Sequence, residues 1–352
     1  MAKKKQYSSS GSAVARREQV RQQRKERLNE GQQSQIPVRK SRKRAPKRSP
    51  WPYVAGTLVV VAVVVGIFFL LSRQSSPTTG TSTGTPVDEG TLQQVTNVDP
   101  GILSQVGTGG LPDPFKKPNG SPAVLKGPTG KPEVFYYGAE YCPYCAAERW
   151  SMVVALSRFG TFHNLHETTS SSTDVYPSTS TFTFYQSSYT SQYIDFVPVE
   201  AEDGQQQPLQ PLTAEQQQIV NTYDKPPYTQ TAGAFPFVTF GNRYMLFGAS
   251  YDPGLLRSNP GDPSSQPLSH QDIASQLSSG NNLSKGVLGT ANYMTAAICS
   301  LTNNQPSNVC SDPSIQQIEA TISKASASSG SSSLAAAFGP MTADVQRRQA
   351  VS

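Results

Sequence analysis

The fold of this chain is decided by residues 134–150, which read Val134-Phe-Tyr-Tyr-Gly-Ala-Glu-Tyr-Cys-Pro-Tyr-Cys-Ala-Ala-Glu-Arg-Trp150. The apolar and aromatic start of this stretch predicts a buried strand, which Gly138 ends. After the two cysteines, apolar residues recur at helical spacing, and these are Met152, Val153, Leu156 and Phe159. We therefore predict a strand, a turn and a helix, with Cys142 and Cys145 on the first turn of the helix.

The start of a helix changes the chemistry of a cysteine. The first backbone N–H groups have no helical partner and carry the positive end of the dipole, so they stabilise a thiolate and lower its pKa. Pro143 suits the first helical position because its missing N–H costs nothing there. We predict that Cys142 is the attacking sulfur and that Cys145, one turn deeper, is the resolving thiol.

The segment Phe135-Tyr-Tyr-Gly-Ala-Glu-Tyr-Cys-Pro-Tyr-Cys145 resembles the active-site segment of the thioredoxin superfamily, and its Pro-Tyr dipeptide is similar to that of glutaredoxins. Further along, Phe235-Pro-Phe-Val-Thr-Phe-Gly-Asn-Arg-Tyr-Met-Leu-Phe-Gly248 predicts a hairpin with Gly-Asn at the turn. By the resemblance, Pro236 is a cis-proline against the active cysteines, and Phe235 offers backbone groups to an extended substrate; the alternative is an ordinary trans proline. The resemblance also assigns substrate contacts to Tyr141, Pro143 and Tyr144.

The wider pattern resembles a narrower group, the membrane-anchored, thioredoxin-like prokaryotic proteins grouped as domain of unknown function 929. The resemblance covers about residues 122–312 and rests on four features, namely Tyr141-Cys-Pro-Tyr-Cys145, Thr181-Phe-Thr-Phe-Tyr185, the Phe235-Pro236 hairpin, and Ala297-Ile-Cys299 with Cys310. It implies the fold and a redox role, but no substrate. Tyr141 stands where thioredoxins usually have Trp, and a long Ser/Thr-rich stretch follows the cysteine helix, so both features leave the specificity open.

These features predict an α/β chain in which a thioredoxin-like domain, a mixed central sheet flanked by helices, follows a single N-terminal transmembrane helix. The expected parts are a basic disordered cytoplasmic arm (1–50), a transmembrane helix (51–72), a flexible linker and entry segment (73–121), the thioredoxin-like domain (122–312) and a mostly disordered tail (313–352). Within them we expect a short docking helix in 95–106, strands at 181–185 and 193–199, and helices at 213–223, 266–276 and 284–302.

The membrane helix is predicted from hydropathy and charge. Residues 54–71 are eighteen uncharged residues, about 27 Å of helix against a bilayer core of about 30 Å. A cleaved signal peptide is the competing interpretation, but its charged region would be far too long here. Sixteen Lys and Arg precede the segment, and only Arg73 directly follows it, so the N-terminus is expected in the cytoplasm and the C-terminal domain outside.

The chain is electrically asymmetric. Residues 1–50 carry a net charge of +13 and the remainder −7, within a total of +6. Such an arm beside a membrane helix predicts contact with anionic lipid. The alternative is phosphate contact with nucleic acid, which we do not expect here.

Two further sets of residues are candidates for sites. His163 and His166 are three residues apart, which on a helix would place them on one face as a metal pair. No third ligand is evident nearby, so we expect no metal and no cofactor. Cys299 and Cys310 are expected to form a structural disulfide outside the cytoplasm, and the alternative is a second redox pair that relays electrons.

The function expected from the sequence is that of a membrane-anchored, extracytoplasmic thiol–disulfide oxidoreductase. Its partners would be extracytoplasmic protein thiols or a membrane redox partner. One alternative is a non-catalytic binding module in which both cysteine pairs are structural disulfides. Another is a copper- or zinc-handling protein that uses Cys142, Cys145 and a histidine as ligands.

Overall fold

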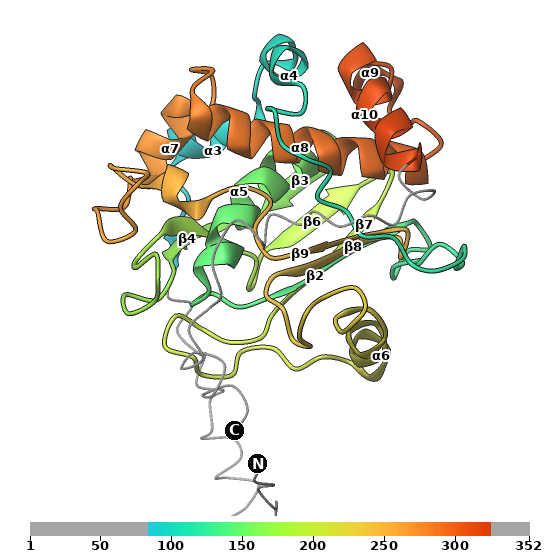
Figure 1. The fold of residues 1–352 in the computed structure, drawn as a ribbon, viewed down its shortest axis with the longest axis horizontal. Helices are drawn as coiled ribbons and strands as arrows, with labels where there is room; N and C mark the ends of the chain where they lie inside the picture. The colour runs from blue at the N-terminus through green and yellow to red at the C-terminus, as the bar shows by residue number, and fades with distance from the viewer. Residues whose placement is uncertain (1–83, 325–352) are drawn as a thin grey trace, which may run out of the picture. The chain divides into compact units, whose positions relative to one another are not determined.

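The computed structural model describes residues 84–324 (Figure 1). The chain divides into two units, 1–75 and 76–352, and every described residue belongs to the second. The predicted basic arm (1–50) and transmembrane helix (51–72) therefore lie outside the described residues. Among residues 84–324, no helix combines the length and the hydropathy needed to cross a bilayer.

The described chain is a mixed α/β structure built around a four-stranded sheet. The sheet has the order β7-β2-β8-β9, with β7 parallel to β2 and β8 antiparallel to β2. Its strands are β2 (Glu133–Gly138), β7 (Asp195–Glu200), β8 (Phe237–Phe240) and β9 (Tyr244–Phe247). Two smaller sheets, β1-β4-β5 and β3-β6, are formed by β1 (Thr85–Pro86), β3 (Gly160–His163), β4 (His166–Thr169), β5 (Ser180–Thr183) and β6 (Ser188–Ser191).

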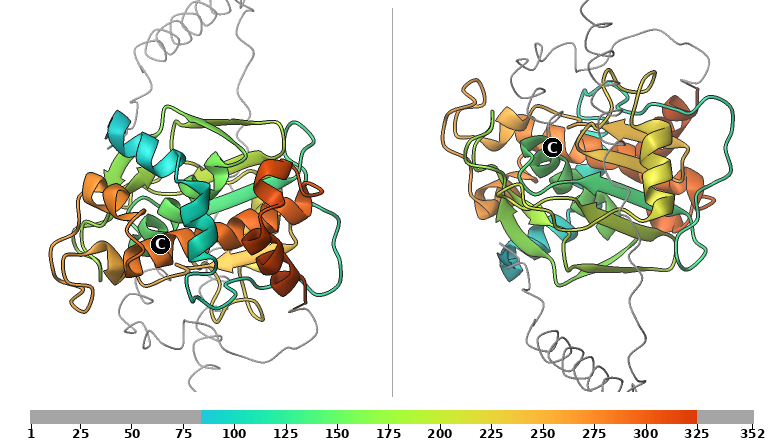
Figure 2. Two further views of the ribbon diagram at one scale, coloured as in Figure 1. Left: turned by 90° about the horizontal axis from the view of Figure 1, so that it is seen from above. Right: turned by 90° about the horizontal axis from the view of Figure 1, so that it is seen from below.

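Helices cover both faces of the central sheet. In Figures 1 and 2, α5 and α8 lie on one face and α6 lies on the other. The helices are α3 (Glu89–Thr96), α4 (Pro100–Val106), α5 (Pro143–Ser157), α6 (Ala214–Tyr223), α7 (His270–Gln276), α8 (Asn282–Leu301), α9 (Ser307–Cys310) and α10 (Pro313–Lys324), with a 3₁₀ turn at Pro253–Leu256.

Strand β2 is apolar and aromatic from Val134 to Tyr137, and both of its faces are covered. Phe135 packs in a cluster with Val220 and Tyr223 of α6. Its neighbours Val134 and Tyr136 belong to the main core, which includes α5 and α8. Successive side chains of a strand point to opposite faces, so a strand covered on both sides reads as the continuous apolar run seen in the sequence.

Local signals in the sequence located several elements correctly. Gly241 and Asn242 have φ angles of +60° and +55° and form the turn between β8 and β9, as the Gly-Asn dipeptide predicted. Thr213 caps α6 in a capping box with Gln216. The last long helix, α8, begins at Asn282 rather than at residue 284.

Helix α4, which buries Leu103, confirms the short docking helix expected in 95–106. The structure differs from the prediction in α3, which lies in the expected linker and buries Val95, and in the segment 313–352. The expected tail begins instead with α10, whose buried residues are Ile315, Ile318 and Ile322. Polar composition suggested unpacked chain, but these short helices gain stability by placing an apolar stripe against α5, α7 or α8.

Candidate active site

The two cysteines lie where the chain leaves β2 and enters α5. Strand β2 ends at Gly138, and α5 begins at Pro143 with Cys142 as its N-cap residue. The Sγ atom of Cys142 accepts a hydrogen bond from the backbone N–H of Cys145, with 3.4 Å between nitrogen and sulfur. The predicted strand, turn and helix are confirmed, and this sulfur lies at the positive end of the helix dipole.

The two thiols differ in exposure. Both are free, but Cys142 is 6% exposed and Cys145 is fully buried. An attacking thiolate must reach a sulfur of another molecule, whereas a resolving thiol needs only to reach its neighbour. The exposures therefore favour Cys142 as the attacking sulfur.

The pKa values of the two thiols are shifted in opposite directions. Burial raises the pKa of the Cys142 thiol, but hydrogen bonds from the side chain and backbone of Cys145 outweigh it, and the pKa falls below that of an ordinary cysteine. Burial is the main cause that raises the pKa of the Cys145 thiol well above its ordinary range. These opposite shifts favour Cys142 over Cys145 as the thiolate of the pair.

A second segment approaches the cysteines from the start of β8. The Phe235–Pro236 peptide bond is cis, as the resemblance predicted. The Sγ atom of Cys142 lies 3.9 Å from the carbonyl oxygen of Phe235, a residue 93 positions further along the chain. Around this contact the fold gathers Ala139, Tyr141, Cys142, Cys145, Tyr144 and Phe235 into one small cluster. Apart from Ala139, these are residues that the sequence analysis assigned to the site.

Gly138 permits a close approach behind Cys145. A Cβ atom at this position would lie 2.2 Å from the hydroxyl oxygen of Tyr136 and 3.0 Å from the sulfur of Cys145. Side chains do not tolerate such contacts with a rigid ring. A residue without a side chain is therefore needed for the tyrosine hydroxyl and the resolving thiol to share this space.

A buried ion pair lies behind the cysteine turn, and sequence reasoning missed it. The Arg149 guanidinium donates to the carboxylate of Glu200 through Nε at 2.9 Å and Nη2 at 2.6 Å, and both side chains are completely buried. The same Nη2 donates to the carbonyl oxygen of Ala139 at 2.8 Å. Arg149 stands four residues after Cys145, so the two side chains share one face of α5. The two-pronged pairing fixes the guanidinium in place.

The ion pair acts on the site through its charge. The positive charge of Arg149 opposes the effect of burial on the pKa of both thiols. Tyr136 connects the parts: its ring centroid lies 5.7 Å from the guanidinium carbon, and its hydroxyl lies 3.5 Å from Oε2 of Glu200. Within residues 84–324, Nη1 of Arg149 has no hydrogen-bond partner. Burying a charged guanidinium costs desolvation free energy, and a buried ion pair often adds little net stability. An effect on the neighbouring thiols is therefore a better explanation for this pair than a contribution to stability.

The sequence contained a weak signal for this pair. Arg149 stands in a mostly apolar stretch of the predicted helix, and Glu200 directly follows the apolar run Phe196-Val-Pro-Val199. A charge inside a buried run needs a partner. The identity of the partner was hidden because 51 residues separate the two.

The Ser/Thr-rich stretch that follows the cysteine helix lies beside the cysteine turn. The backbone N–H of Ser171 donates to the carbonyl oxygen of Tyr141 at 2.8 Å. On the other side, the N–H of Glu140 donates to the carbonyl oxygen of Glu202 at 2.9 Å. Two loops are thus attached to the residues directly before Cys142.

The two histidines considered as a possible metal pair do not share a helix face. His163 ends β3 and His166 begins β4. The remaining histidine, His270, begins α7. In the part of the chain that the structure describes, no three His, Cys, Asp or Glu side chains are grouped as metal ligands would be.

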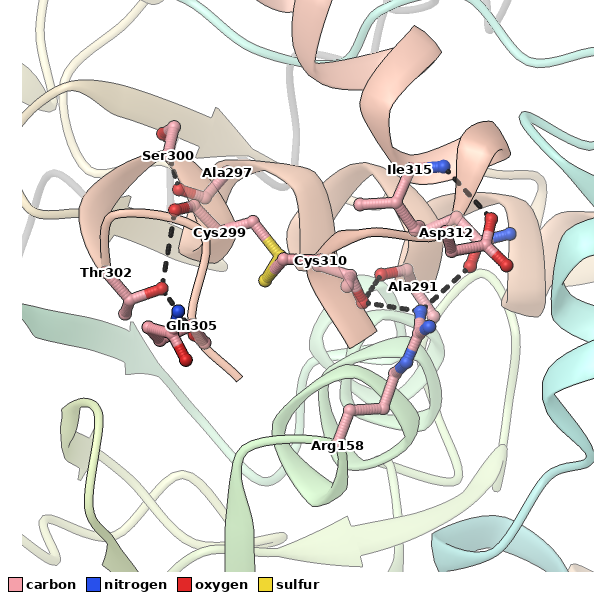
Figure 3. The surroundings of a disulfide bond; sticks show 12 residues. Arg158, Ala291, Ala297, Cys299, Ser300, Thr302, Gln305, Cys310, Asp312 and Ile315 are labelled. Atoms are coloured by element: carbon pink, nitrogen blue, oxygen red, sulfur yellow. Dashed lines mark hydrogen bonds between the residues drawn. A yellow bond between two sulfur atoms is a disulfide. The ribbon is translucent and has the colours of Figure 1, made fainter. Parts of the chain in front are cut away.

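The second cysteine pair joins the end of α8 to α9 (Figure 3). Cys299 and Cys310 form a disulfide with 5.6 Å between their Cα atoms, which confirms the predicted bond. Both residues are completely buried. Because neither sulfur can be reached by another thiol, the structural role is favoured over the redox relay.

The geometry can be set beside known proteins. The model of a family described as a domain of unknown function, DUF929, matches residues 125–300, which is half of the chain. The chain belongs to the DUF929 family. The match includes both cysteines of the turn, the Arg149–Glu200 pair and Phe235–Pro236, so the whole candidate site lies within the DUF929 domain. No curated protein and no solved structure matches the chain.

Proposed function

We propose that this DUF929 protein is a thiol–disulfide oxidoreductase with a thioredoxin-like fold. The observation that carries the proposal is the state of Cys142, a free thiol with a lowered pKa at the N-terminus of α5. A second thiol, that of Cys145, lies one turn deeper and is fully buried. A reactive thiolate with a shielded neighbour is the arrangement that disulfide exchange requires.

The topology supports the thioredoxin-like part of the proposal. Strand β2 lies between the parallel strand β7 and the antiparallel strand β8. The cysteine helix follows β2, and the cis Pro236 precedes β8. Both features agree with what the resemblance implies, and Pro236, Phe235, Tyr141, Pro143 and Tyr144 are proposed to shape the substrate side of the site.

The proposed reaction proceeds in two exchanges. The thiolate of Cys142 attacks one sulfur of a substrate disulfide, forms a mixed disulfide and releases the other substrate sulfur as a thiolate. Cys145 then loses its proton and attacks the sulfur of Cys142, which releases the second substrate thiol. The substrate gains two electrons and the Cys142–Cys145 pair is oxidised to a disulfide. The same steps in reverse oxidise a substrate dithiol.

The Arg149–Glu200 pair is proposed to assist the second exchange. Cys145 is buried and its thiol pKa is raised, so forming its thiolate is costly. The guanidinium is held near both sulfurs by Glu200 and the carbonyl oxygen of Ala139. Its charge stabilises whichever of the two sulfurs is negative at each step.

We also propose that the domain faces the outside of the membrane. Residues 54–71 are uncharged and follow the basic arm of residues 1–50, which favours an N-terminus in the cytoplasm beside anionic lipid. The Cys299–Cys310 disulfide is of the kind that persists in oxidising compartments. Digestion of cells whose outer barrier has been removed, with a protease that cannot cross the membrane, should cut the C-terminal domain and spare the arm. Protection of the domain would overturn this placement.

The experiment that tests the activity is a redox titration of the full-length chain. The Cys142–Cys145 couple is equilibrated with glutathione buffers, and alkylation of Cys142 by iodoacetamide is followed against pH. We expect a reversible two-electron couple and alkylation that persists below the ordinary thiol pKa of about 8.5. An oxidising potential would indicate an oxidase or isomerase, and a strongly reducing one a reductase that takes electrons from a membrane partner.

The second candidate function is a non-catalytic binding module, and the low exposure of Cys142, 6%, is the observation in its favour. It predicts that Cys142 resists alkylation near neutral pH and that the couple does not exchange with glutathione. Either result would overturn the oxidoreductase proposal.

A further inference from the structure

A polar groove adjoins the cysteine turn. Its volume is about 630 Å³, within the range of about 300–1,000 Å³ that is usual for ligand sites. The lining comes from residues 167–173, Ser178, residues 204–206, Thr85 and His270. Most of this lining belongs to the Ser/Thr-rich stretch after the cysteine helix, which the site described above does not use.

The walls of the groove are held by hydrogen bonds. On one side, the N–H of Ser170 donates to the carbonyl oxygen of Thr179, and the N–H of Ser178 donates to that of Ser171, each at 2.9 Å. On the other side, Oδ1 of Asp203 accepts from the backbone N–H groups of residues 205 and 207 at 2.8 Å. The groove is therefore a built surface rather than a gap between loose loops.

The chemistry of the lining is one-sided. Eight Ser and Thr residues and two Gln residues line the groove, together with one Gly, one Glu and one His. The residues that line it include no lysine, arginine, aliphatic or aromatic side chain other than the imidazole of His270. Oε2 of Glu167 lies 3.5 Å from Nδ1 of His270, while Oε1 is buried and, within residues 84–324, has no hydrogen-bond partner. Such a surface suits groups that both donate and accept hydrogen bonds. It offers an acidic group no lysine or arginine and places Glu167 beside it, and it offers an aliphatic group no apolar contact.

Backbone hydrogen bonds connect the walls of the groove to the residues just before Cys142. Ser171, in one wall, binds the carbonyl oxygen of Tyr141, and Glu202, which precedes the other wall, binds the N–H of Glu140. Tyr141 is the neighbour of Cys142. An extended chain advances about 3.3–3.6 Å per residue. When the cysteine of a bound polypeptide lies at Cys142, the residues one or two positions from that cysteine therefore reach the end of the groove.

We infer that this groove binds the polypeptide segment flanking the substrate cysteine and selects segments rich in Ser, Thr, Asn or Gln over acidic or aliphatic ones. The inference rests on the proposed function, because the occupant is placed by its bond to Cys142. In the bound segment, backbone amides and side-chain amides and hydroxyls exchange their hydrogen bonds to water for hydrogen bonds to the groove walls. Specificity of this kind comes mainly from disfavouring other segments: a carboxylate there would lie near the carboxylate of Glu167 with no lysine or arginine to offset the repulsion, and an isobutyl group would find no apolar contact.

The test uses the full-length chain with Cys145→Ser, so that Cys142 reacts once and is not resolved. Three peptides carry a central cysteine bonded to thionitrobenzoate, with three residues on each side drawn from Ser/Thr/Gln, from Leu/Val or from Glu/Asp. The thiolate of Cys142 attacks the peptide sulfur and releases thionitrobenzoate, and mass spectrometry verifies the peptide adduct. We expect the Ser/Thr/Gln peptide to react about ten-fold faster than the other two.

Variants of the groove locate the preference. Ser172→Trp fills one wall and Gln205→Trp fills the other; both positions are exposed. Each variant should bring the ratio of peptide rates close to one. Ser278→Trp, a matched change at an exposed position outside the groove, should keep the ratio of the parent. Two variants from different walls guard against one that fails to fold.

The outcomes separate the two proposals. If glutathione disulfide reacts with Cys142 but the three peptides react equally, or the ratio survives both groove variants, the groove inference is overturned and the proposed function stands. Faster reaction of the Leu/Val peptide also overturns it, and would point to the second hollow of about 490 Å³, whose lining includes Tyr137, Leu209 and Leu212. If neither glutathione disulfide nor any peptide reacts, both proposals fall.

Discussion

The two cysteine pairs of this chain show how position on a helix decides what a thiol can do. Cys142 caps the N-terminus of α5, whereas Cys299 lies in the last turn of α8, where its carbonyl oxygen accepts from the backbone N–H groups of Thr302 and Asn304. The N-terminal end of a helix stabilises a thiolate and the C-terminal end does not. One pair consists of free thiols, of which Cys142 is 6% exposed, and the other is a completely buried disulfide.

The comparison teaches that cysteine content alone says little about reactivity. Each pair lies close together in the sequence and each includes a helix end. What separates them is the surroundings: a guanidinium, a carbonyl from another segment and a polar groove around the first, and packed apolar side chains around the second. The predictions below would break or sharpen this contrast.

The largest expected effect is on exchange activity. Cys142→Ser should lower the rate of disulfide exchange by roughly three orders of magnitude or more, because a hydroxyl is not ionised at neutral pH. The double variant Cys299→Ala with Cys310→Ala should retain the rate within about two-fold. Stopped-flow reduction of a peptide disulfide measures both. A large loss in the double variant would mean that the second pair is a relay.

The next effect concerns the ion pair behind the first pair of cysteines. Arg149→Met leaves Glu200 buried without a partner and should cost roughly 3–5 kcal/mol of stability. It should also raise the pKa of the Cys142 thiol, because the lowering charge is gone. Urea unfolding and pH-dependent alkylation measure the two effects.

Two further variants control that experiment. Arg149→Met with Glu200→Leu removes both charges and should recover part of the stability while the thiol pKa stays high. Arg158→Met changes an arginine that caps the other end of α5 and binds Asn292 and Thr295, so the thiol pKa should not move. An unchanged pKa in Arg149→Met would show that the ion pair is structural only.

The disulfide should act on stability alone. Its loop spans eleven residues of sequence separation, for which the loss of the bond should cost roughly 3 kcal/mol. Dithiothreitol reaches this buried bond only when the chain unfolds, so it should lower the melting temperature of the parent but not that of the Cys299→Ala, Cys310→Ala variant. Equal sensitivity of the two proteins to the reductant would contradict the structural assignment.

The smallest expected effect is on the pH dependence of stability. It arises from Glu148, a second titrating group of α5, and not from the thiol of Cys142. Burial raises the pKa of Glu148 to about 7 despite two hydrogen bonds from Ser250. A raised carboxyl pKa means that the folded state holds its proton longer, so stability is full below about pH 4.5 and is lost as pH rises to about 7.

Glu148→Gln should remove roughly 3 kcal/mol of this pH dependence, the equivalent of a pKa raised from 4.5 to about 7. Urea unfolding at pH 4.5, 6 and 7.5 gives the slope for the parent and the variant. Alkylation of Cys142 should keep its pH profile, since the two groups titrate separately. A parent whose stability rises between pH 4.5 and 7 would contradict the sign.

The sequence by itself determined the local parts of this protein. The strand before Gly138, the helix after Cys142, the cap at Thr213 and the turn at Gly241 each depend on residues within about one helical turn of one another. Such signals survive in any fold, because they arise from backbone hydrogen bonds, φ preferences and side-chain periodicity. The Cys299–Cys310 pairing was also within reach, since few cysteines were left to choose from.

Only the tertiary structure decided what surrounds those parts. Glu200 meets Arg149 across 51 residues, and Phe235 meets Cys142 across 93. The isoleucines of α10 stand in a polar sequence and were not predicted to be buried; in the structure they are buried where α10 packs on α8. The groove lies between two segments, one of which binds the backbone of Tyr141 and the other that of Glu140, just before Cys142. Burial, charge pairing and cavities are properties of distant segments brought together, so no local pattern encodes them.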